Sequence, residues 1–393
     1  MKRLVPAFFV LLLAVLACSI PGLPTDKPPA TKPPITEPPV TEPPLPTGPL
    51  PSGFVIAPDP TGIVFYAADG SVTGSLATGD LGYIGPQSLH VAGGTAGGIP
   101  PVIYFTWRDG PPQFFLNTSG AESMLMEQPD FYRLGGAPGS SYIAYSTAAY
   151  TDAGLLTRLY IGTPATIAAA APAVDMIEPG GFGLKPLAFR MESGAPTGIW
   201  YTGCLYGIGG DLVYDPCNRV TFLDLNTGVS SELVGDGYNP SQLSPDHTWV
   251  AYAQPGGGMP LTILNLQTGA NYTFLIWPAN DRGSGDGVFS PDNAFVAWME
   301  GSGYRMDEPP TFHSIVRLGT TDGLPFSDFE AASFNATAGF SVVWANPVGW
   351  LDNDSVLIQV GGVDWHDNAV LLLDLSGVMT YLASGNFIGL TYP

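Results

Sequence analysis

The stretch that decides the fold is Ser-Pro-Asp-His-Thr-Trp-Val-Ala-Tyr at residues 244–252. A second copy, Ser-Pro-Asp-Asn-Ala-Phe-Val-Ala-Trp, follows 46 residues later at 290–298. In each copy, proline presets φ at about −65° for the second position of a type I turn, and aspartate hydrogen-bonds nearby amides. We expect the fourth residue, His247 or Asn293, to close the turn in the left-handed region. The alternating residues that follow are typical of a strand, so each copy predicts a hairpin.

A second kind of hairpin follows the first. Its strand ends in a turn whose glycine supplies a positive φ, as at 220–228, 262–269 and 370–377. The same ending recurs more weakly at Gly70, Gly120, near Gly162 and at Gly323. Adding the strand before each Ser-Pro-Asp turn gives four antiparallel strands per repeat, at a mean spacing of about 49 residues. This pattern predicts an all-β, seven-bladed β-propeller.

These repeats resemble the TolB-type propeller of the bacterial Tol system, whose repeats read roughly Phe-Ser-Pro-Asp-Gly, an alternating strand and then Asp-x-x-Thr-Gly. The match is close at 244–269 and 290–298, fair at 220–228 and 370–377, and faint elsewhere. His247 and Asn293 stand where the family has glycine. The resemblance implies the fold and little beyond it, and nothing matches the hydrolase domain of prolyl-oligopeptidase-like enzymes.

The two ends of the β-rich region, 51–393, are predicted to close the ring. Residues 54–56 and 63–66 read as the second and third strands of the first blade, which therefore lacks an inner strand. Residues 386–390 form a strand left over after the seventh blade. Pairing the two ends removes two exposed sheet edges. No convincing helix is expected, and the alanine run at 168–173 is predicted to be a loop or a strand.

The N-terminal region predicts export and anchoring. Lys2 and Arg3 precede an apolar run at 4–16, which is typical of a signal peptide and short for a membrane span. Residues 15–18, Val-Leu-Ala-Cys, resemble the lipobox of bacterial lipoproteins, which implies a signal peptide at 1–17 and a lipid on Cys18. The alternative is ordinary signal cleavage with a stray cysteine.

The segment 18–50 is dominated by proline and threonine, with four repeats that end in paired prolines. Paired prolines block helix and sheet alike, so we expect a polyproline II tether. A plain spacer is preferred to a docking motif. At about 3.1 Å per residue the tether gives the domain reach from a membrane.

The net charge excludes one class of partner, and the cysteines predict a cross-link. The formal net charge is −21, and such a surface repels nucleic acid and anionic lipid headgroups. We therefore expect no nucleic-acid partner. Cys204 and Cys217 flank the predicted loop between the second and third strands of the fourth blade. In an exported protein they predict a disulfide; a metal site is the alternative, but no histidine is near in sequence.

The loops between second and third strands should share one face of the disc with the links between blades, whereas the Ser-Pro-Asp turns lie on the other face. Long aromatic insertions fall mostly on the first face, and rigid aromatic side chains beside polar groups suit protein or glycan contact. The alternative is that they only pack their own loops. The candidate binding residues are Trp107, Arg108, Tyr206, Tyr304, Arg305, Asp364, Trp365 and His366.

Catalytic and metal motifs are weak. The sequence has four histidines and neither a G-x-S-x-G nor an H-E-x-x-H motif. Asp352-Asn353-Asp354 lacks the further spaced ligands of a calcium loop and predicts a solvated turn. We predict a monomeric, non-catalytic binding or scaffolding module without cofactor, held outside the cytoplasmic membrane and partnered by an envelope protein or glycan. The alternative is a glycan-acting hydrolase with two carboxylates in the channel.

Overall fold

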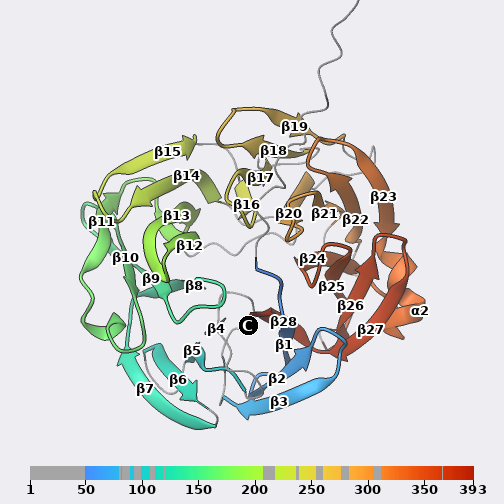
Figure 1. The fold of residues 1–393 in the computed structure, drawn as a ribbon, viewed down its shortest axis with the longest axis horizontal. Helices are drawn as coiled ribbons and strands as arrows, with labels where there is room; N and C mark the ends of the chain where they lie inside the picture. Colours follow the sequence, from blue (N-terminus) through green and yellow to red (C-terminus); the bar gives the residue numbers. More distant parts are fainter. Residues whose placement is uncertain are drawn as a thin grey trace, which may run out of the picture. The chain divides into compact units, whose positions relative to one another are not determined.

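The computed structural model describes residues 49–78, 81, 89–92, 99–106, 111–118, 120–206, 217–235, 239–253, 260–275, 283–303, 311–364 and 366–393. Leu45–Pro393 forms one compact unit. Its described residues build seven four-stranded antiparallel sheets, which stand as blades around a central channel (Figure 1). The predicted seven-bladed propeller is confirmed. Within the described ranges, no helix is long and apolar enough to cross a membrane.

The blades follow one another in chain order, and each has its first strand at the channel and its fourth at the rim (Figure 1). Blade 1 consists of β28 (Asn386–Thr391), β1 (Gly53–Asp59), β2 (Gly62–Ala67) and β3 (Val72–Ala77). Blade 2 consists of β4 (Leu89–Val91), β5 (Val102–Thr106), β6 (Gln113–Thr118) and β7 (Ala121–Glu127). Blade 3 consists of β8 (Phe131–Gly136), β9 (Ile143–Thr151), β10 (Gly154–Gly162) and β11 (Pro172–Glu178).

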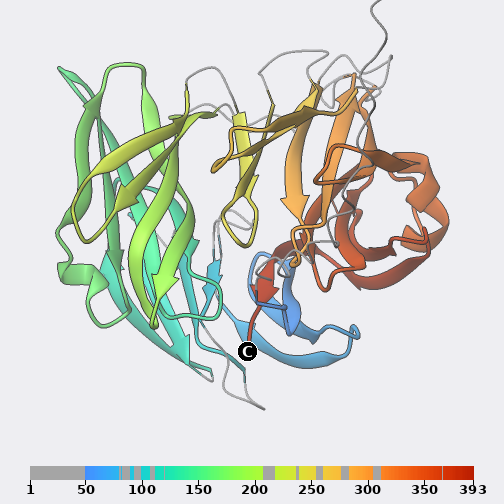
Figure 2. The same cartoon turned by 45° about the horizontal axis from the view of Figure 1, so that its top comes forward.

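Blades 4 to 7 follow the same order. They are β12 (Phe182–Glu192), β13 (Ala195–Leu205), β14 (Cys217–Asp224) and β15 (Ser230–Val234); β16 (Asn239–Leu243), β17 (Trp249–Ala253), β18 (Leu261–Asn265) and β19 (Asn271–Thr273); β20 (Gly283–Phe289), β21 (Phe295–Ser302), β22 (His313–Thr320) and β23 (Pro325–Glu330); and β24 (Trp344–Trp350), β25 (Ser355–Gly361), β26 (Asn368–Asp374) and β27 (Met379–Ser384). The longest strands, β12 and β13, have 11 residues each and form a tall hairpin (Figure 2).

The Ser-Pro-Asp turns form as predicted. Ser244 Oγ donates to Asp246 Oδ1 at 2.6 Å and accepts the Trp249 N–H at 2.9 Å, and the second turn repeats both bonds at the same lengths. His247 and Asn293 both have a φ of 61°, so the predicted left-handed closing residue is confirmed. The two turns also meet, because the Asp246 N–H donates to Asn293 Oδ1 at 3.3 Å.

The hairpins between third and fourth strands depart from the prediction in one blade. Six of the seven predicted glycines have a positive φ, from 71° to 92°, and Gly162 does not. After Gly162 the chain makes a 3₁₀ turn, η1 (Ile167–Ala169), and then enters β11 at Pro172. The alanine run is therefore part helical turn and part strand. Proline suits the first position of β11 because that strand lies at the rim, where an N–H is not needed for the ladder.

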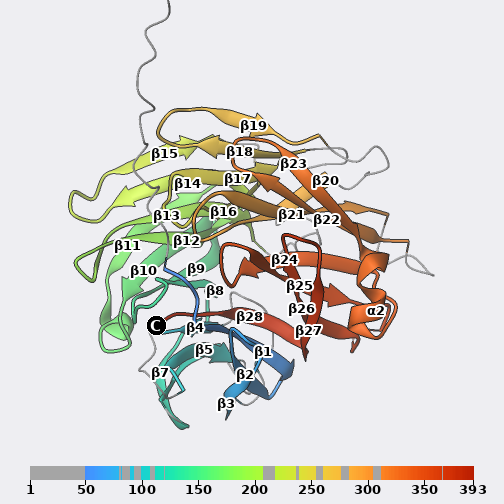
Figure 3. The same ribbon diagram turned by 45° about the vertical axis from the view of Figure 1, so that its right-hand side comes forward.

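A second helical segment was not predicted. η2 (Ala331–Phe334) and α2 (Asn335–Ala338) link blades 6 and 7 (Figure 3). η2 packs against β22 and β23, and α2 packs against β26 and β27. Phe334 is fully buried in the core between these blades. Asn335 Oδ1 accepts the Val342 N–H at 2.8 Å, which holds the segment closed. Helical turns of four residues carry too little periodicity to be read from sequence.

The ring closes as predicted. β28 pairs with β1 from Gly53 opposite Thr391, and it becomes the inner strand of blade 1. A buried side chain of blade 7 clamps the junction: Gln359 Oε1 accepts the Phe387 N–H at 2.6 Å, and its Nε2 donates to the Gly385 carbonyl at 3.1 Å. Every inner strand contacts the next around the ring, and the apolar cores lie largely between neighbouring blades. Burial between blades therefore holds the disc together.

Candidate functional site

Three tyrosines gather where blades 3 and 4 meet, on the face that carries the loops between second and third strands. Tyr150 lies near the end of β9, Tyr206 follows β13, and Tyr132 lies in the inner strand β8. Tyr206 is held to the segment that links blades 3 and 4, because its N–H donates to the Gly181 carbonyl at 3.0 Å. We call Tyr132, Tyr150 and Tyr206 the tyrosine surface.

The three rings form an edge-to-face chain. The Tyr206 ring centroid lies 5.4 Å from that of Tyr132 and 5.6 Å from that of Tyr150, with interplanar angles of 65° and 64°. Perpendicular contacts of this kind place the positive edge of one ring on the negative face of another. Tyr132 is buried and Tyr206 half-buried, whereas the Tyr150 side chain is 69% exposed. The buried rings thus support an exposed one.

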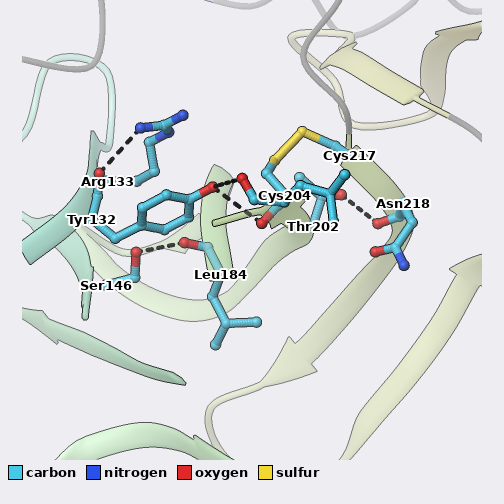
Figure 4. Close-up of a disulfide and its surroundings, with 9 residues drawn as sticks. Tyr132, Arg133, Ser146, Leu184, Thr202, Cys204, Cys217 and Asn218 are labelled. Atoms are coloured by element: carbon cyan, nitrogen blue, oxygen red, sulfur yellow. Dashed lines mark hydrogen bonds between the residues drawn. A yellow bond between two sulfur atoms is a disulfide. The ribbon is translucent and has the colours of Figure 1, made fainter. Parts of the chain in front are cut away.

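A disulfide and a buried hydroxyl fix this surface. Cys204 and Cys217 are bonded across the paired strands β13 and β14, which confirms the predicted disulfide. The Tyr132 hydroxyl donates toward the carbonyls of Cys204 and Leu205 at 3.1 and 3.3 Å (Figure 4). Position 183 must be glycine, because an added Cβ there would lie 2.6 Å from the Tyr132 ring. Tyr206 therefore follows a strand end that is held covalently.

Two arginines lie in the same two blades, and one of them contacts a tyrosine. Arg219 Nη2 contacts Glu178 Oε2 at 2.6 Å, an ion pair between blades 4 and 3. Arg133 follows Tyr132 in β8 and folds over its neighbour's ring, with Cζ 4.4 Å from the ring centroid (Figure 4). Its Nη1 donates to the Tyr132 carbonyl at 3.3 Å, whereas Nε is buried without a hydrogen-bond partner.

The other predicted site residues are distributed as follows. Asp364 and His366 lie between β25 and β26 of blade 7, both exposed, and Asp364 Oδ1 accepts the His366 N–H at 3.0 Å. They belong to a blade that does not adjoin Tyr206. Six predicted residues lie outside the described residues: Cys18, Trp107, Arg108, Tyr304, Arg305 and Trp365. Tyr132 and Arg133 were missed, because an inner strand gives no sequence signal for a loop-face site.

A cavity of about 330 Å³ occupies the end of the channel near the Ser-Pro-Asp turns, and all seven inner strands contribute to its lining. Burial lowers the pKa of His90, whose Nε2 lies 2.8 Å from the Ser140 carbonyl. Burial also lowers the pKa of His247 to about 4, against the opposing effect of Asp246. Both imidazoles are therefore neutral near pH 7.

Carboxylates are scarce along the channel. None lines the cavity among the described residues, and the described inner strands carry only Asp286 and Glu192. Glu192 ends β12 at the hairpin tip, 3.5 Å from Arg190 Nε, and Asp286 accepts from Asn346 Nδ2 at 3.0 Å. The described part of the chain also has no group of three acidic, histidine or cysteine side chains placed to hold a metal. Asp352 accepts the Asp354 N–H at 2.8 Å within its own turn.

Comparison with known proteins agrees with the fold. No family model matches the chain, and no curated protein matches it. Similar solved structures include TolB from Acinetobacter baumannii (14% identity, TM-score 0.42, 72% of this chain and 65% of that chain) and an oligogalacturonate lyase in complex with manganese (13%, 0.48, 72% and 74%). Prolyl oligopeptidase B from Galerina marginata, as apo protein, is also similar (9%, 0.51, 76% and 42%). The chain spans less than two thirds of the TolB and peptidase structures. At these identities the likeness concerns the β-propeller fold alone.

Proposed function

We propose that this chain is a non-catalytic binding module, anchored outside the cytoplasmic membrane, whose tyrosine surface contacts a cell-envelope glycan or protein. One observation carries the proposal: Tyr150 is 69% exposed and rests on Tyr206, which follows the disulfide-bonded end of β13. A rigid aromatic side chain loses little entropy on binding, so a preorganised support improves affinity. Tyrosine is also enriched among the residues that contribute most to binding at interfaces.

The anchoring half of the proposal depends on the sequence. Charged residues, an apolar run and the lipobox-like residues 15–18 support lipidation of Cys18, and the proline-rich segment supports a tether. A mass spectrum of the mature N-terminus tests this directly. Diacylglycerol on Cys18 is the expected result, and an unmodified N-terminus after another cleavage site would remove the anchor from the proposal.

The competing function is a glycan-acting hydrolase, which needs two carboxylates about 5–10 Å apart across the scissile bond. The described residues around the cavity offer no such pair. The neutral imidazoles of His90 and His247 do not replace it, because His90 lies against the Ser140 carbonyl and His247 packs on the Trp200 ring. The geometry of the described chain therefore favours binding over hydrolysis.

The test of binding is a single substitution with a matched control. Full-length protein in detergent is applied to a glycan array and to purified envelope polysaccharide. We expect Tyr150→Ala to weaken the binding of any ligand found by about tenfold to a hundredfold, as for a central aromatic contact. Tyr272→Ala removes a tyrosine that is 38% exposed on the rim strand β19, and it should bind as wild type does. Equal binding by all three proteins would place the site elsewhere.

A further inference from the structure

Arg133 differs from the other described arginines in its partners. Four arginines pair with a carboxylate: Arg158 with Asp175 at 3.2 Å, Arg190 with Asp224 at 2.7 Å, Arg219 with Glu178 at 2.6 Å and Arg317 with Glu300 at 2.8 Å. Among the described residues, Arg133 has no carboxylate within ion-pair distance. The chain has 34 acidic and 13 basic residues, so an arginine without an acidic partner is unusual in this protein.

The contacts of Arg133 leave most of its hydrogen-bonding capacity unused. A guanidinium has five N–H donors. Here Nη1 makes one long bond to the Tyr132 carbonyl, and Nε is buried with no acceptor in the described structure. A buried donor without an acceptor costs free energy, and such donors are few in folded proteins. The face of the Tyr132 ring keeps the guanidinium in place, as a cation–π contact does.

The position of Arg133 links it to the proposed binding site. Its cation lies over Tyr132, the Tyr132 ring meets Tyr206, and Tyr206 meets the exposed Tyr150. A continuous chain of contacts thus runs from a cation on the inner strand β8 to an exposed aromatic ring on the β9–β10 hairpin. Tyr132 is buried within this chain, so a ligand that contacts both ends would meet the exposed Tyr150 ring and the half-buried Arg133 cation.

We propose that Arg133 binds a carboxylate of the ligand, and that this ligand is an acidic glycan of the uronic-acid type; the inference rests on the proposed binding function. A guanidinium matches a carboxylate through two parallel N–H···O bonds, which gives both affinity and orientation. Arg133 is therefore a specificity-determining residue of the tyrosine surface. Its role is to distinguish a charged sugar from a neutral one.

The surroundings of Tyr150 favour a sugar, and the charge of the chain limits how acidic that sugar can be. A net charge of −21 repels densely charged polyanions, so the ligand of a single arginine would be a sugar chain with few carboxylates. Next to Tyr150, Thr151 and Asp152 are exposed and polar. A pyranose presents an apolar C–H face to the tyrosine ring and hydroxyl groups to such neighbours. A peptide anchor would instead be expected to insert into a desolvated pocket.

The experiment compares sugars that differ only in charge. Full-length protein in detergent is titrated by calorimetry with unsulfated uronate-containing tetrasaccharides and with their carboxyl-reduced, neutral forms. Wild type should prefer the acidic form by about tenfold or more, and added salt should reduce that preference because the pair is partly exposed. Arg133→Gln should abolish this preference, so that the acidic and neutral forms bind with equal affinity.

Two further variants keep the test decisive. Arg158→Gln removes the same charge from an exposed ion pair on β10 and should keep the preference. Arg133→Lys keeps the charge but lacks the planar guanidinium, so it should retain only part of the preference for the acidic sugar. This variant also tests the role of Arg133 if Arg133→Gln fails to fold. Equal wild-type affinity for acidic and neutral sugars would overturn the inference while the binding function stands. If neither sugar bound, both the role of Arg133 and the proposed binding of glycans would be overturned. Selective binding of peptides with a free C-terminal carboxylate would show that the ligand is a peptide and not a glycan.

Discussion

His247 shows how one turn residue can connect two blades. The Ser-Pro-Asp pattern predicted its left-handed φ, because a short polar residue in that region closes the turn. The pattern could not predict its ring contact, since the Trp200 ring, 4.3 Å away between centroids, belongs to the preceding blade. Local rules fix the backbone of a turn, whereas the side chain's neighbours depend on how blades pack. Burial against Trp200 then keeps the imidazole neutral.

This burial predicts a pH dependence of stability. The pKa of His247 is about 4 in the folded chain against an ordinary 6.5, so the unfolded chain binds the extra proton between these values. Stability contributed by the neutral ring is therefore complete above pH 6.5 and is lost as the pH falls toward 4, by roughly 3 kcal/mol. His247→Asn, which tolerates the same φ, should reduce the slope of the unfolding free energy against pH between 6.5 and 4.5, as measured by denaturant. His366→Asn, in an exposed loop, is the control, and an equal slope in wild type and His247→Asn would contradict the prediction.

At the scale of elements, the strands were predictable and the site only in part. Alternating residues and turn glycines indicated the hairpins, and the same reasoning placed Tyr206 on the loop-rich face. Tyr132 and Arg133 could not be placed there, because the tyrosine surface combines an inner strand of blade 3 with loops of blades 3 and 4. A site built from three separate segments has no local signature. Predicting it requires knowing which blades are neighbours and how far each strand extends.

The disulfide is the element that supports this site, and its removal has a predicted cost. Cys204 and Cys217 close a ring of about 14 residues, for which the chain-entropy model gives ~3 kcal/mol. Cys204→Ser with Cys217→Ser should lower the free energy of unfolding by about that amount, and dithiothreitol should do the same to wild type. The double variant should not respond to dithiothreitol, which makes it the control. A wild-type protein whose unfolding is insensitive to the reductant would show that the bond contributes little.

At the scale of the whole molecule, counting strands predicted the ring. The first blade lacks an inner strand, and one strand is left over at the C-terminus. Pairing the two completes the blade, and the structure shows this pairing between β28 and β1. The number of blades could be predicted because six of the seven repeats keep a glycine with positive φ after the third strand, even where the strands diverge. The contacts of Gln359 at the junction were not accessible, because a buried glutamine in a strand carries no mark of its distant partner.

Ring closure makes the C-terminal strand essential to a domain whose cores lie largely between blades. Deleting 386–393 removes β28, exposes the β1 edge and uncovers Phe54 and Ile56, which are fully buried. Because the first and last blades then lose their shared core, we expect the loss to exceed about 5 kcal/mol, which is comparable to the stability of a whole domain. The truncated chain should elute as aggregate and lose its cooperative thermal transition. Deleting only the exposed Pro393 leaves every pair of β28 intact and should melt as wild type does. If the longer deletion remained monomeric with an unchanged melting temperature, the blades would be stable without closure, and the ring would not be what holds the tyrosine surface in place.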